Sequence, residues 1–88
     1  MAELAIRLAR FGSAEVWAFY DDITGVVDRI ESRAPARTQA YRISVDGVAL
    51  LTQTFNAGTR TARPVGLLYR NLADAEGPSQ GFVFETRN

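Results

Sequence analysis

The Asp46–Gly47 pair constrains the fold of this 88-residue chain more than any other feature, because it marks a tight turn between two extended stretches. An Asp–Gly pair supplies the two positive-φ positions of a type I′ turn, whose twist matches that of an antiparallel hairpin. The stretch before the pair alternates polar residues with the apolar residues Tyr41, Ile43 and Val45. Period two is typical of a strand with one buried face. The sequence therefore predicts a hairpin formed by residues 40–45 and 48–55.

A second hairpin is predicted upstream. Residues 16–20 and 26–30 are rich in β-branched and aromatic side chains, and residues 21–25 between them begin with Asp and end with Gly, which is common turn chemistry. Pro35 disfavours helical geometry at the residue before it. We therefore interpret residues 31–38 as a loop.

Downstream of the first hairpin, residues 56–59 have the composition of a turn. We expect a strand within residues 60–68. Pro64 has no N–H to donate, so this strand either lies at a sheet edge or begins at Val65. After a further loop, residues 82–85 predict a closing strand.

The first eleven residues fit two structures. Leu4, Ile6 and Leu8 share one face of a strand, whereas the same segment also carries a helical apolar stripe that Gly12 would end. We expect a strand, because the neighbouring predicted elements are all β.

Together these stretches predict about six or seven short strands at intervals of about ten residues. The expected fold is a single all-β domain over residues 1–88, a small antiparallel β-sandwich of immunoglobulin-like or jelly-roll-like kind. The alternative is an α+β domain with an N-terminal helix on an antiparallel sheet. A chain of this size buries roughly 64% of its unfolded surface, which is enough for one modest core.

Composition excludes most catalytic chemistry. The chain has neither His nor Cys, so Cys nucleophiles, disulfides, His relays and the commonest metal ligands are absent. We expect no catalytic residues, no cofactor and no bound metal. The acidic residues Asp21, Asp22 and Asp28 suggest a calcium site or a small carboxylate enzyme, but their spacing does not match a calcium loop, and turn chemistry explains them as well.

Charge and hydropathy restrict location and partners. The formal net charge is +0, so a general polyanion-binding surface, and with it a nucleic acid partner, is not expected. No apolar run approaches the ~20 residues of a membrane span, and no signal peptide is visible at the start. The expected location is the cytoplasm, or a particle assembled there.

All ten cationic residues are Arg. This bias reflects either codon preference or selection for the planar, bidentate contacts of guanidinium groups at an interface. Arg residues flank two predicted loops. If those loops meet, four side chains are candidates for polar or anion contacts, namely Arg33, Arg37, Arg60 and Arg63.

The segment 16–20 is apolar on both faces of its predicted strand. A strand with one solvated face should carry polar residues there. Either another part of the chain covers Trp17 and Phe19, or these rings contact another subunit or stack on a ligand such as a sugar. Phe11 and Tyr69 are candidates for the same interface.

Residues 27–32, 38–45 and 55–61, with the Ala57–Gly58–Thr59 turn, resemble the strand pattern of small immunoglobulin-like sandwiches, including those of phage and virion structural proteins. The resemblance covers about half of the chain and carries no functional residues. It implies a building block of an assembly. The expected function is a non-enzymatic structural module that associates with its own copies or other protein subunits, with a carbohydrate- or ligand-binding sandwich as the alternative.

Overall fold

The computed structural model describes residues 2–11, 13–35, 40–45, 47–53, 58–72 and 82–87. These residues form mostly antiparallel β-sheet, as the sequence predicted. Within them no α-helix occurs, and the one helical element is a short 3-10 turn, η1, at Tyr69–Asn71.

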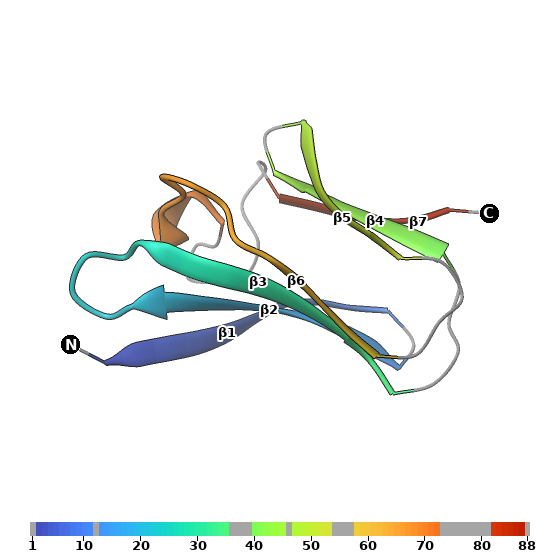
Figure 1. Cartoon of the computed structure of the whole chain (residues 1–88), viewed down its shortest axis with the longest axis horizontal. Helices are drawn as coiled ribbons and strands as arrows, with labels where there is room; N and C mark the ends of the chain where they lie inside the picture. Colours follow the sequence, from blue (N-terminus) through green and yellow to red (C-terminus); the bar gives the residue numbers. More distant parts are fainter. Residues whose placement is uncertain are drawn as a thin grey trace.

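The strands form two sheets, which Figure 1 shows one above the other. The four-stranded sheet has the order β1-β2-β3-β6, made of Glu3–Phe11, Ala14–Asp21, Val27–Ala34 and Gly58–Ala62. The three-stranded sheet has the order β5-β4-β7, made of Val48–Gln53, Ala40–Val45 and Phe82–Arg87. In an immunoglobulin constant domain the third strand belongs to the second sheet, whereas here β3 directly follows β2 in the first.

Both predicted hairpins are confirmed. Strands β4 and β5 pair across the Gly47 turn with Val45 opposite Val48, and Gly47 has a φ of 79°, the positive value that favours glycine. Its neighbour Asp46 lies outside the described residues. Strands β2 and β3 pair across the turn that ends at Gly25.

The N-terminal segment is a strand, and the helical alternative is wrong. Strand β1 pairs with β2 along its length, with a register shift between Arg7 and Ala9. An isolated helix shorter than about 12–15 residues is marginal in water. Alternation of Leu4, Ile6 and Leu8 with polar or small residues instead lets this segment extend an existing sheet.

Two boundaries differ from the sequence prediction. Strand β3 continues to Ala34, so the predicted loop begins four residues too early. The loop was inferred from Pro35, which directly follows the strand, and the polar residue Ser32 lies buried on the core side of the strand. Strand β6 starts at Gly58 and ends at Ala62, before Pro64. It lies at a sheet edge as predicted, but no strand begins at Val65, which is fully exposed.

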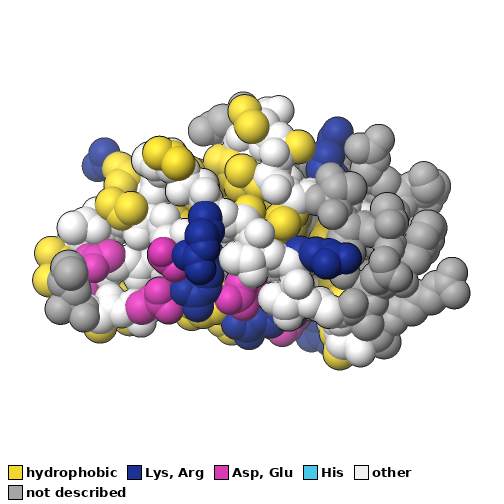
Figure 2. Space-filling model, in the orientation of Figure 1, with side chains coloured by type: hydrophobic (Ala, Val, Ile, Leu, Met, Phe, Trp, Pro, Cys, Tyr) yellow, Lys and Arg dark blue, Asp and Glu magenta, His cyan; other side chains and the backbone are white. Residues whose placement is uncertain are grey.

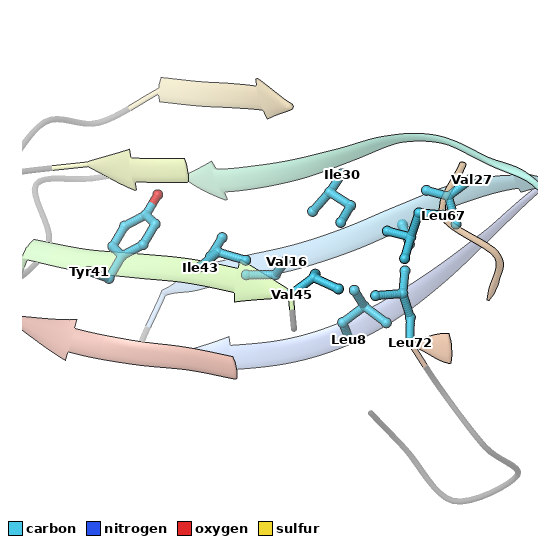
Figure 3. Packing of buried hydrophobic residues seen from close by; sticks show 10 residues of the cluster. Leu8, Val16, Val27, Ile30, Tyr41, Ile43, Val45, Leu67 and Leu72 are labelled. Carbon is cyan, nitrogen blue, oxygen red and sulfur yellow. The ribbon is translucent and has the colours of Figure 1, made fainter. Parts of the chain in front are cut away.

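The core lies between the two sheets. Figure 3 shows side chains of β1, β2 and β3 directed toward those of β4, with Leu67 and Leu72 of the β6–β7 connection filling one end. Tyr41 of β4 reaches across to β3, where its hydroxyl shares a hydrogen bond with that of Ser32. Both residues are 0% exposed, and a buried hydroxyl without a partner is costly. This bond therefore joins the two sheets at a fixed position.

Candidate functional site

The side of the four-stranded sheet that faces away from the core carries a dense set of charged and aromatic side chains. Along β2 and β3 these residues alternate with buried ones, and β2 and β3 are paired so that Trp17 lies opposite Glu31, and Phe19 opposite Arg29. Opposite residues of an antiparallel pair share one face of the sheet. We call this surface the outer face and define it by Glu15, Trp17, Phe19, Arg29, Glu31 and Arg33.

Guanidinium groups cover the aromatic rings of the outer face. The Arg29 guanidinium carbon lies 3.9 Å from the centre of the Phe19 ring. The Arg33 guanidinium carbon lies 5.5 Å from the ring centres of both Trp17 and Phe19. Arg stacks on aromatic rings through its planar cation while its stem covers apolar surface. Strand β2 is apolar on both faces over residues 16–20, and arginine side chains of the neighbouring strand β3 cover the rings on its outward face.

Carboxylates hold these arginines in place. Glu31 accepts hydrogen bonds from Arg29 at 2.9 Å and from Arg33 at 3.0 Å. Arg29 also donates to Glu3 of β1 at 3.0 Å, so one guanidinium links two strands across β2. Arg7 of β1 donates to Glu15 of β2 at 3.1 Å. Figure 2 shows this mixture of positive and negative side chains in the part of the molecule where Figure 1 draws the four-stranded sheet.

The ion pairs favour the charged forms of these groups. Hydrogen bonding to Arg29, and then to Arg33, lowers the pKa of Glu31. The hydrogen bond from Arg7 lowers the pKa of Glu15, and the Trp17 indole adds to this effect. A general acid needs a raised pKa to stay protonated near neutral pH. These two carboxyl groups are therefore ionised at neutral pH and serve as hydrogen-bond acceptors.

Acid is expected to weaken the outer face through Glu31. Its pKa is lower in the folded chain than in the unfolded chain, so its stabilising contribution is present above the ordinary Glu pKa and is lost as the pH falls through the folded value. The melting temperature of the Glu31→Gln variant should fall less on acidification from pH 6 to pH 3 than that of the wild type. If the melting temperatures of both proteins fell by the same amount over this range, Glu31 would not be the source of the acid sensitivity.

Two of the four aromatic candidates lie together. Trp17 and Phe19 are neighbours on the outer face, half-buried under Arg33. Tyr69 instead stacks on Tyr20, with ring centres 4.2 Å apart, and both pack against the core. Phe11 is the last residue of β1 and pairs with Ala14, while its side chain lies outside the described part of the structure. The rings of Trp17, Phe19 and Tyr69 do not form one platform.

The arginine candidates do not gather into one anion site. Arg33 belongs to the outer face, whereas Arg60 lies opposite the buried Ser32 and therefore on the other side of the sheet. Arg63 follows β6 and donates to Asp28 at 3.1 and 3.2 Å. The fourth candidate, Arg37, lies outside the described residues. Arg33 and Arg63 thus bind different carboxylates of their own chain, Glu31 and Asp28.

The acidic turn is explained by hydrogen bonds within the chain. Asp21 accepts the backbone N–H groups of Ile23 and Thr24, both at 2.8 Å, and these bonds lower its pKa. Asp22 accepts the N–H of Ala2 at 3.0 Å. Over the described ranges no three acidic side chains cluster as a cation site. Hydrogen bonding in and around the turn therefore accounts for Asp21 and Asp22.

Sequence reasoning singled out Trp17, Phe19 and Arg33 but missed the other three residues of the outer face, which are Glu15, Arg29 and Glu31. Residues 31–33 fall in the stretch that the sequence predicts as a loop. The signal was present, because Arg29, Glu31 and Arg33 alternate with core-facing residues at period two.

Comparison with known proteins adds no assignment. A scan against family models, a search of curated proteins and a search of solved structures found no match to this chain. In the part of the chain that the structure describes, no helix has the length and apolar character of a membrane span.

Proposed function

We propose that this chain is a non-enzymatic interaction module, a small β-sandwich that associates with its own copies as a building block of a larger assembly. Phage and virion particles are assemblies of this kind. One observation carries the proposal. Strand β1, nine residues long, lies at the edge of the four-stranded sheet and pairs only with β2 among the described strands. A long unpaired edge offers a row of backbone donors and acceptors to another chain.

The chemistry of the sheet supports this role. The outer face combines Arg, Trp and Phe, residue types that are enriched at protein interfaces. Its positive and negative groups are interspersed, so two copies can approach without strong repulsion. The ring face that a sugar needs at Phe19 is occupied by Arg29, and for this reason we put forward no ligand-binding function.

The test is the mass of the protein in solution. Light scattering over a concentration series should give a mass that rises above 9.7 kDa, the mass of one chain. Association through sheet edges involves backbone hydrogen bonds, so it should persist at moderate salt. A mass of one chain at every concentration would overturn the proposal.

A further inference from the structure

The backbone of β1 has a defined set of groups that face away from its own sheet. Asp21 is the register partner of Glu3. It donates its N–H to Val26 at 3.0 Å and accepts from Gly25 at 2.9 Å, both on the β3 side. On the other side, Asp22 donates to the carbonyl of Ala2 at 3.0 Å. Ala2 therefore points its carbonyl at β2, and Glu3 points its N–H and C=O at the free edge.

Along β1 the backbone N–H and C=O groups of successive residues point alternately toward β2 and toward the free edge, as long as the pairing with β2 is regular. The free-edge groups are therefore those of Glu3, Ala5 and Arg7. A register shift between Arg7 and Ala9 marks a bulge at Leu8. Bulges bend a strand and end regular pairing. The part of the edge that is regular enough to accept another strand is thus Glu3 to Arg7.

The side chains of this short edge are self-complementary. Glu3 and Arg7 lie on the side of the outer face, on either side of the small residue Ala5, and are about half-exposed. Leu4 and Ile6 lie on the core side. Ile6 packs partly against the core, whereas Leu4 is 44% exposed and is accessible to a neighbouring strand.

We propose that β1 pairs antiparallel with β1 of a second copy, with Ala5 opposite Ala5, an inference that rests on the proposed self-association. In this register the free-edge groups of both strands face each other. Each Glu3 lies opposite Arg7 of the other copy, and each Leu4 opposite Ile6. Opposite charges and apolar pairs across strands are stabilising. The interface is two-fold symmetric and joins two four-stranded sheets into one continuous sheet.

Other registers lose this complementarity. A shift by two residues in either direction puts Ala5 opposite Glu3 or Arg7 and separates the charge pairs. A larger shift puts Arg7 opposite Arg7, and like charges directly opposite are destabilising. A shift by one residue pairs free-edge groups with groups that already point at β2. Charge and hydrogen-bond direction therefore select one register.

A single cysteine tests the position of the two-fold axis, because the chain contains no other. Residues opposite each other in such a pair have Cα atoms about 5.5 Å apart, within the range that a disulfide spans. Under mild oxidation, Ala5→Cys should form a covalent dimer that reducing agent reverses. The matched control is Ala49→Cys, an exposed alanine on β5 of the other sheet, and it should cross-link much more slowly. Equal rates for the two variants would overturn the register.

Charge exchange gives a second test. Glu3→Arg and Arg7→Glu each place like charges opposite one another, and each variant alone should associate on the order of tenfold more weakly. A mixture of the two variants restores opposite charges at both pairs, so heterodimers should form with about wild-type affinity. Melting curves of each variant verify that it is folded. Absence of recovery in the mixture would contradict the pairing of Glu3 with Arg7.

The outcomes separate this inference from the proposed function. If the wild type associates but Ala5→Cys does not cross-link faster than the control, self-association stands and the β1 interface is wrong. If the wild type is a single chain at every concentration, both proposals fail.

Discussion

Replacing Leu72 by alanine is expected to lower the free energy of unfolding by about 2–5 kcal/mol. Leu72 is 0% exposed and belongs to the core cluster that both sheets share. It follows η1, where its N–H donates to the carbonyl of Tyr69 at 2.8 Å, so its backbone is tied in place. Truncation would leave a cavity at the end of the core, because the anchored turn cannot collapse into the space.

Urea denaturation followed by Trp17 fluorescence measures this loss. Val65→Ala is the matched control, because Val65 lies in the same β6–β7 connection and is 100% exposed. Surface substitutions of this kind change stability by no more than about 0.5 kcal/mol. Equal destabilisation by the two substitutions would show that Leu72 does not contribute to the core as described.

Removing the hydroxyl of Tyr41 has the second large expected effect. Tyr41→Phe leaves the buried Ser32 hydroxyl without its partner, and an unsatisfied buried polar group costs about 1–3 kcal/mol. The two residues lie on different sheets, and both are fully buried. We therefore expect a lower urea midpoint with an unchanged slope, since the change in exposed surface on unfolding is almost the same.

A double-mutant cycle isolates the pair. Ser32→Ala should also destabilise, because it removes the buried hydrogen bond between the two sheets. The double variant should lose less stability than the sum of the two single losses, since both single changes remove the same hydrogen bond. Additive losses would mean that the two hydroxyl groups do not depend on each other.

The structure gives a physical reason for arginine at one position of this lysine-free chain. Arg29 lies over the Phe19 ring and also donates to Glu3, Asp28 and Glu31. A flat guanidinium can stack on a ring while its edge donates several hydrogen bonds, and a lysine ammonium cannot. This explains Arg29 itself, whereas codon preference remains sufficient for arginines such as Arg60 that show no such geometry.

The sequence by itself determined the local elements. Alternation of side chains and the Asp46–Gly47 pair predicted the hairpin of β4 and β5, because a two-residue turn and its strands are set by neighbouring residues. The absence of His and Cys likewise limited the available chemistry without any structure. The predicted strand boundaries were wrong where residues distant in the sequence form the surroundings of a side chain. Pro35 favours a loop over residues 31–38, but β3 continues to Ala34. Ser32 in this stretch is buried, and its bond to Tyr41 on the other sheet explains why.

Tertiary structure alone decided how the outer face and the edge are built. Trp17 and Phe19 were recognisable as too apolar for a solvated face, yet their cover comes from Arg29 and Arg33 across the β2–β3 register. The free edge of β1 depends on strand order, which no local pattern encodes. Turn and strand preferences act over a few residues, whereas the pairing of distant strands is selected by packing and charge summed over the whole chain.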